Sequence, residues 1–253
     1  MNEAIIQLED LYKSFGDERV LTGLDLSVPR GETLVIMGRS GAGKSVILKH
    51  MVGLMSPDRG EVYFDGHRLN TLKRVELERM RKRMGMLFQG AALFDSMSVA
   101  QNVSLGLRRH TRMSEEEIRT VVTAKLVAVG LSGVEEKMPA ELSGGMRKRV
   151  GLARAIAMDP ELVLYDEPTT GIDPITADAI NNLILDTRRQ FGVTSVIVTH
   201  DVASALKVGT LISLLVEGRI IFSGNPEEVK NTDNPYVRQF LEGSAEGPHK
   251  LYF

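Results

Sequence analysis

The stretch Gly38-Arg39-Ser40-Gly41-Ala42-Gly43-Lys44-Ser45-Val46 contains the pattern G-x-x-x-x-G-K-[ST]. A β-rich run at 32–37 precedes it and a helical pattern at 46–54 follows, which is the context of a phosphate-binding loop. Glycines let several backbone N–H groups point at one anion, and a helix N-terminus favours negative charge. Lys44 places a positive charge on the β and γ phosphates, and Ser45 offers a hydroxyl to Mg²⁺. Residues 38–46 are therefore predicted to bind a nucleotide with its magnesium ion.

Two acidic residues follow a short apolar run in the sequence Leu-Val-Leu-Tyr-Asp-Glu at 162–167. The apolar residues suit a buried strand, and ligands of open α/β sheets bind at the carboxyl ends of strands. Asp166 is predicted to hold Mg²⁺, and Glu167, which points the other way, to accept a proton from an attacking water. Two adjacent acids at a strand end are often only a solvated turn. The phosphate-binding loop in the same chain favours the metal-and-base interpretation.

Short apolar runs alternate with helical patterns along much of the chain, which predicts an α/β fold. The runs at 5–11 and 20–28 have no helix between them, and they predict a small antiparallel sheet near the N-terminus. Ser114 and Glu117 form a capping box, and apolar residues at helical spacing continue up to Gly130. The region 90–158 is therefore expected to be a helical insert in the α/β core.

Composition restricts the class of protein. The 253 residues are 43% hydrophobic, which is enough to bury a substantial core. The 31 basic and 33 acidic residues give a net charge of -2, which argues against a general nucleic-acid binder. The absence of cysteine excludes disulfides and thiolate metal sites and fits a reducing cytoplasm. We see no signal-peptide pattern, and no apolar run approaches the ~20 residues that span a bilayer, so any membrane path is expected from another chain.

Residues 142–146 read Leu-Ser-Gly-Gly-Met and precede a helical pattern that starts near Arg147. Together with the motifs above, this segment resembles the signature Leu-Ser-Gly-Gly-Gln of the ABC ATPase family. The resemblance implies a P-loop NTPase with a RecA-like core, an N-terminal antiparallel β-subdomain and an inserted α-helical subdomain. It also implies one domain over 1–243, a tail over 244–253, and a homodimer in which Ser143, Gly144 and Gly145 contact the γ-phosphate bound to the other subunit. A helix N-cap with a glycine turn describes the same residues, but it does not predict the remaining matches.

Four further residues match family positions in order along the chain. Tyr12 resembles the aromatic residue that stacks on adenine, with a core strand tyrosine as the alternative. Gln89 matches the glutamine that contacts Mg²⁺ or the water, and is otherwise a polar loop residue. Asp173 matches the loop that crosses the dimer interface, and is otherwise a helix N-cap. His200 matches the switch histidine that faces the γ-phosphate, and is otherwise a solvated residue at a strand end.

The same resemblance implies that ATP and Mg²⁺ are bound and that ATP is hydrolysed. The implied ATP contacts come from Tyr12 and residues 38–46, the metal contacts from Ser45, Gln89 and Asp166, and catalysis from Glu167, His200 and Gln89.

Three segments narrow the resemblance further. Residues 84–94, 138–146 and 237–243 resemble the ATPases of the Mla (maintenance of lipid asymmetry) phospholipid transporters, and Met146 in place of glutamine suits this branch. The branch implies a permease, a substrate-binding protein with an MCE domain, and a small STAS-domain partner. It also implies that the ATPase lies on the cytoplasmic face of the inner membrane and powers transport of a phospholipid or a related hydrophobic molecule between membranes.

Three alternatives stay open at the level of sequence. The first is the ATPase of a solute importer, such as one for amino acids, because the cassette differs little between transporters. The second is a soluble ABC ATPase acting on nucleic acid or the ribosome, but the chain has one copy of each motif and no heptad run. The basic residues at 79–83 are more typical of a solvated helix face than of a nucleic-acid contact. The third is a nucleotide-binding regulator without turnover, which the joint presence of Asp166, Glu167 and His200 disfavours.

Overall fold

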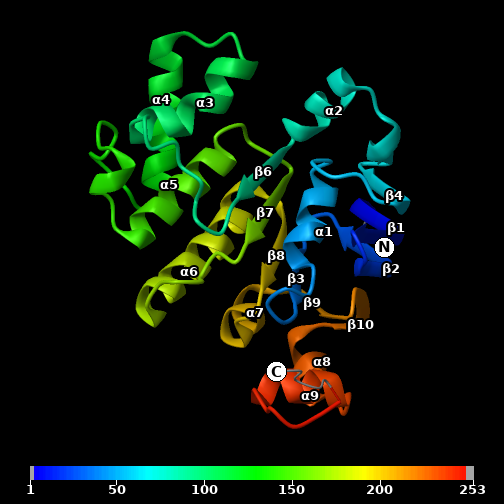
Figure 1. The fold of residues 1–253 in the computed structure, drawn as a ribbon. Helices are drawn as coiled ribbons and strands as arrows, with labels where there is room; N and C mark the ends of the chain where they lie inside the picture. The colour runs from blue at the N-terminus through cyan, green and yellow to red at the C-terminus, as the bar shows by residue number, and fades with distance from the viewer. Residues whose placement is uncertain (1–2, 249–253) are drawn as a thin grey trace. The chain divides into compact units, whose positions relative to one another are not determined.

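The computed structural model describes residues 3–248 (Figure 1). The chain divides into two compact units, Met1–Thr71 with Val198–Phe253 and Leu72–Ile197. Each unit combines strands with helices, as the alternating pattern predicts. Within the described part of the chain, no helix is both long enough and apolar enough to cross a membrane.

The first unit begins with the predicted antiparallel sheet. Its strands lie in the order β2-β1-β4-β5, and every neighbouring pair is antiparallel. The sheet consists of β1 (Ala4–Phe15), β2 (Glu18–Pro29), β4 (Arg59–Phe64) and β5 (His67–Arg68). Apolar side chains such as Ile6, Leu8 and Leu24 are fully buried. Register shifts interrupt the β1–β2 pairing between Leu11 and Tyr12 and again between Lys13 and Ser14.

The first unit also holds the strand that precedes the glycine-rich loop. This strand, β3 (Thr33–Met37), is buried along its whole length and runs parallel to β9 (Leu211–Val216), which pairs antiparallel with β10 (Arg219–Gly224). A strand buried on both faces needs apolar residues throughout, which explains its continuous apolar sequence. The helical segments of this unit are α1 (Lys44–Met51), η1 (Leu69–Thr71), α7 (Val202–Val208), α8 (Pro226–Asn231) and α9 (Pro235–Glu242).

The second unit is built around parallel strands. In it β6 (Met84–Leu87) pairs in parallel with β7 (Leu162–Asp166), and β8 (Thr194–Thr199) lies next to β7, with its last two residues assigned to the first unit. The helical segments are α2 (Arg74–Arg81), α3 (Val99–His110), α4 (Glu115–Ala128), η2 (Pro139–Glu141), α5 (Gly144–Ile156) and α6 (Pro174–Phe191).

Helices α3, α4 and α5 pack against one another within the range expected for the helical insert. The start of α4 is the capping box that the sequence predicts: Ser114 Oγ accepts from the N–H of Glu117, and Glu117 Oε2 accepts from the N–H of Ser114 at 2.7 Å. Ile118, Val122 and Leu126 then form its buried stripe. The extent of the insert as a separate subdomain, and the end of the single domain at residue 243, stay predictions.

Candidate functional site

The glycine-rich loop leads from buried β3 directly into the first turn of α1. Gly43 is the N-cap of this helix and has φ +98°, a conformation that side chains with Cβ atoms rarely adopt. A Cβ at Gly43 would also lie 2.8 Å from Val20 Cγ1. The first backbone N–H groups of a helix have no partner inside the helix, so this end of α1 offers donors to an anion.

The side chain of Lys44 folds back over the glycine-rich loop that precedes it. Its side chain is only 6% exposed, and its Nζ donates to the carbonyl oxygens of Gly38 at 2.7 Å and of Arg39 at 2.9 Å. The ammonium is therefore held at the mouth of the loop and away from bulk water. Arg39, Ser40 and Gly41 are exposed, so the outer side of the loop is accessible to a phosphate chain.

The end of β7 presents the two predicted acids. Asp166 and Glu167 are each only 8% exposed, which does not fit a solvated turn. Glu167 has φ +48°, an uncommon conformation for a residue other than glycine. The hydroxyl of Thr170 donates to Glu167 Oε2 at 2.9 Å. The strand end therefore carries two shielded carboxyl groups, one of them held at a fixed angle.

The signature-like segment starts α5 and contacts the loop that starts α6. Ser143 is the N-cap of α5, and its Oγ accepts from the N–H of Met146 at 3.2 Å. A Cβ at Gly145 would lie 2.6 Å from Thr176 Cγ2, so this glycine permits close contact between the two helix starts. Asp173 is the N-cap of α6 and accepts from the N–H of Thr176 at 2.9 Å. Hydrogen bonds from the side chain and backbone of Thr176 lower the pKa of Asp173.

Gln89 is exposed in the segment that follows β6. Two residues with positive φ come next, Ala91 at +63° and Ala92 at +46°. The guanidinium of Arg154 donates to the carbonyl oxygens of both alanines, at 2.6 Å and 2.7 Å, and burial lowers the pKa of Arg154. The loop after Gln89 is therefore held in an unusual conformation by a side chain of α5.

His200 belongs to the first unit and is exposed directly after β8. The next residue, Asp201, is the N-cap of α7, and its Oδ1 accepts from the N–H of Ala203 at 3.0 Å. This cap fixes where the strand ends and the helix begins, and so places His200 at an exposed strand end. Gln89, Asp166, Glu167, Ser143 and Asp173 belong to the second unit.

Strand β1 has two candidates for the aromatic residue that stacks on adenine, and the sequence resemblance points only to Tyr12. Tyr12 is partly buried, with the guanidinium of Arg59 at 5.2 Å from its ring centre. Phe15 ends β1 and is 47% exposed, a large exposure for an aromatic side chain. Phe15 pairs with Glu18 at the turn into β2, and Val20 of β2 contacts the position of Gly43. Its exposure at the end of this hairpin makes Phe15 a second candidate for the aromatic position.

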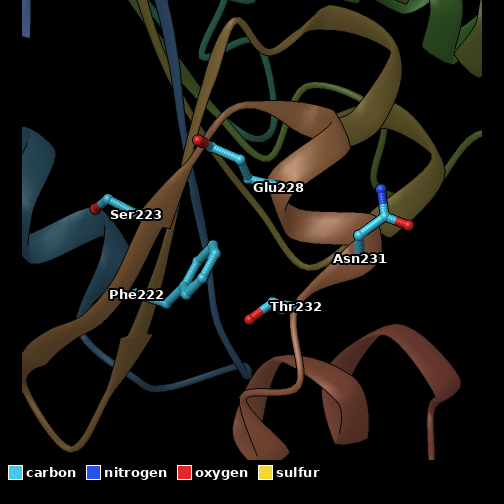
Figure 2. A pocket seen from close by; sticks show the side chains of 5 residues that line it. All are labelled: Phe222, Ser223, Glu228, Asn231 and Thr232. Carbon is cyan, nitrogen blue, oxygen red and sulfur yellow. The ribbon is translucent and has the colours of Figure 1, made fainter.

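A separate hollow of about 400 Å³ lies between β10 and the end of α8. Figure 2 shows its lining, Phe222, Ser223, Glu228, Asn231 and Thr232. Glu228 Oε2 accepts from the N–H of Asn225 at 2.7 Å as part of a helix cap. None of the predicted site residues lines this hollow.

The chain belongs to the ABC transporter family, because residues 21–170, more than half of its length, match that family. It is 42% identical to "Intermembrane phospholipid transport system ATP-binding protein MlaF" of Haemophilus influenzae over 253 residues, which cover all of this chain and 96% of that protein. It is 43% identical to "Probable ribonucleotide transport ATP-binding protein mkl" of Mycobacterium tuberculosis over 243 residues, which cover 96% of this chain and 68% of that protein.

Solved structures confirm the fold. CbiO1 of Clostridium perfringens, part of the ABC transporter complex cbiONQ, matches with a TM-score of 0.83 and 32% identity over 90% of this chain and 91% of that one. The dimeric ATP-binding cassette MJ0796 bound to ADP and Pi matches with a TM-score of 0.81 and 34% identity over 87% of this chain and 98% of that one. The predicted ABC ATPase fold and the resemblance to Mla-type ATPases are therefore confirmed, and the chain is an ATPase that binds ATP.

Proposed function

We propose that this chain is the ATPase subunit of a transporter that moves phospholipid or a related hydrophobic molecule between membranes. The observation that carries this proposal is the 42% identity to MlaF of Haemophilus influenzae over the whole of this chain and 96% of that protein. The mycobacterial relatives named for ribonucleotide transport are equally similar in sequence, and they support a second candidate cargo. They favour it less, because this chain covers only 68% of their length.

The local geometry supports magnesium binding by Asp166 and Ser45. Mg²⁺ prefers hard oxygen ligands, and the carboxylate of Asp166, shielded at the end of β7, is such a ligand. The hydroxyl of Ser45 and the amide oxygen of Gln89 complete the proposed donor set. When bound, the ion neutralises charge on the phosphate oxygens.

The remaining roles follow from position and chemistry. Residues 38–46 wrap the phosphates, and the ammonium of Lys44 exchanges its loop carbonyls for phosphate oxygens. Glu167 accepts the proton of the attacking water, and His200 contacts the γ-phosphate. Phosphoryl transfer depends mainly on positioning and charge, and these groups are the part of the site that one subunit supplies. We propose that the ring of Phe15 stacks on adenine. The sequence resemblance alone favours Tyr12 for this role.

The proposed assembly is a homodimer on the cytoplasmic face of the inner membrane. Ser143, Gly144 and Gly145 of each subunit contact the nucleotide bound to the other, and Asp173 lies at their interface. The dimeric cassette that resembles this chain supports that arrangement. The proposed partners are a permease, an MCE-domain protein and a STAS-domain protein, in line with relatives named as part of an intermembrane transport system.

Glu167→Gln tests the proposed catalytic base. The amide keeps the shape of the side chain but cannot accept the proton, so ATP binding is retained and hydrolysis falls by at least about 100-fold. In the presence of ATP, the variant is then expected to accumulate as a closed dimer, which size-exclusion chromatography detects. Asn182→Ala, on the exposed surface of α6, is the matched control and hydrolyses ATP at the parent rate. Parent-rate hydrolysis by Glu167→Gln would remove the assignment of the base.

The cargo is tested with the complex isolated from native membranes through a tag on this chain. Mass spectrometry identifies its protein subunits and bound small molecules, and a Lys44→Ala complex serves as a control for nucleotide-independent binding. Co-purification of an MCE-domain protein, a permease and phospholipid supports the lipid assignment. Ribonucleotides bound to the membrane subunits would support the second candidate. Co-purification of a solute-binding protein, without phospholipid and without ribonucleotide, would leave the ATPase activity assigned but remove both cargo assignments.

A further inference from the structure

Lys148 is a buried lysine on α5 that contacts the loop of the proposed base. Its side chain is 6% exposed, and its Nζ donates to the carbonyl oxygens of Pro168 and Thr170, both at 2.7 Å. The carbonyl oxygen of Glu167 lies at 3.4 Å from the same nitrogen. An ammonium has three N–H donors, and three backbone carbonyls of one short loop surround this one.

This arrangement is costly, which indicates a role beyond filling space. Burial lowers the pKa of Lys148, while the charge of Glu167 acts in the opposite direction. An uncharged side chain of similar size would avoid the cost of burying an ammonium. The other buried lysine of the second unit, Lys125 on α4, is held differently, by an ion pair with Asp159 and by the ring of Phe191 at 4.2 Å.

The loop that Lys148 contacts holds Glu167 in a strained conformation. Glu167 has φ +48°, and such a residue stays in place only where its surroundings fix it from several sides. Thr170 provides two contacts, from its N–H to the Glu167 carbonyl at 3.3 Å and from its hydroxyl to Glu167 Oε2. Lys148 in turn binds the carbonyls of Glu167, Pro168 and Thr170. The direction of the Glu167 carboxylate therefore depends on Lys148.

We propose that Lys148 is a positioning residue for ATP hydrolysis, which fixes the 167–170 loop so that the Glu167 carboxylate meets the attacking water. The inference rests on the proposed role of Glu167 as the base. It adds that α5, whose N-cap is Ser143, also sets the angle of the base in its own chain. Helix α5 then connects two groups: the segment at its start, which is proposed to contact the nucleotide of the partner subunit, and the base that acts on the nucleotide of the same subunit.

The test compares steady-state ATPase kinetics of four full-length variants. Lys148→Met removes the donors and keeps the length of the side chain. Because a displacement of about 1 Å at a reacting group costs up to about 100-fold in rate, kcat is expected to fall 10- to 100-fold. KM for ATP is expected to stay within about two-fold, because the phosphate-binding loop is untouched. Lys148→Gln, which keeps two N–H donors, is expected to recover part of kcat.

The other two variants separate the possible failures. Lys125→Met is the control for burial of a lysine, and its kcat is expected to match the parent. Glu167→Gln shows whether the base itself is assigned correctly. If Glu167→Gln is inactive while Lys148→Met and Lys148→Gln keep the parent kcat, the positioning role is wrong and the proposed function stands. If Glu167→Gln hydrolyses ATP at the parent rate, Glu167 is not the base, and the positioning role of Lys148, which rests on that assignment, is overturned with it.

Folding is monitored in parallel by thermal melting of every variant. A loss of kcat in Lys148→Met that Lys125→Met reproduces at an equal loss of melting temperature would overturn the proposal, because both would then be stability effects. If Lys148→Met does not fold, Lys148→Gln decides. A folded Lys148→Gln with the KM of the parent and reduced kcat supports the proposal, and one with the kcat of the parent overturns it.

Discussion

Replacing Gly85 of β6 with alanine tests how the strand before Gln89 is held. A Cβ at this position would lie 2.2 Å from the carbonyl oxygen of Ala155 and 3.0 Å from its carbonyl carbon. Ordinary contact begins at 3.4 Å, so the added atom is roughly 1 Å too close to the backbone of α5. Ala155 lies in the last turn of α5, whose backbone packs directly against β6, so relief of the clash requires β6 and α5 to separate. Overpacking costs about 1–3 kcal/mol, and a backbone clash of this size lies near 3 kcal/mol.

Urea unfolding of Gly85→Ala provides the measurement. The chain has no tryptophan, so far-UV circular dichroism is the suitable signal. With a urea dependence of about 1–3 kcal/mol per M, the midpoint is expected to fall by about 1 M or more. Gly90→Ala is the matched control, since a Cβ there meets nothing within 4 Å. It is expected to be neutral or up to about 1 kcal/mol more stable. Equal midpoints for both variants and the parent would refute the argument.

Three further perturbations separate local effects. Burial lowers the pKa of His50, so the folded protein favours the neutral imidazole. The contribution of His50 to the free energy of unfolding is therefore complete above pH ~6.5 and falls as the pH drops toward the folded pKa, by at most about 1.4 kcal/mol per pH unit. His50→Leu should flatten melting temperature between pH 7.5 and 5.5, and an unchanged slope would contradict this. Arg154→Met removes two donors from the loop after Gln89, so hydrogen exchange of residues 88–94 should speed up at least about 10-fold, and equal protection would count against it. Ser143→Asp keeps a good N-cap but places a negative charge where the partner's phosphate is proposed to bind. The free energy of unfolding should change by under about 0.5 kcal/mol while ATPase activity falls, and full activity would rule out the proposed phosphate contact.

Local sequence predicted the elements whose structure depends on local chemistry. The glycine-rich loop lies between β3 and α1 because its residue types suit only a tight turn at a helix start. The capping box at Ser114 and the buried run before Asp166 were also readable, because a cap and an apolar strand involve neighbouring residues. These features needed no knowledge of distant contacts.

Contacts between distant residues could not be predicted in the same way. Lys148 and its carbonyl acceptors are about 20 residues apart, and a lysine in a helix normally indicates an exposed position. The choice between Tyr12 and Phe15 depends on the register shifts in β1, because each shift changes which residues share a face. Alternation along the strand alone therefore does not identify the exposed aromatic residue.

For Ser143 and Asp173, the structural and functional interpretations do not exclude each other. Each side chain is the N-cap of a helix, as the plainer interpretation requires. A serine hydroxyl that accepts one N–H still has its own proton to donate and a second lone pair, so capping α5 leaves Ser143 able to bind a phosphate oxygen. Capping also orients the hydroxyl beside the free N–H groups of the helix, which is where an anion binds most favourably. The cap therefore also orients this serine for the phosphate contact that we propose.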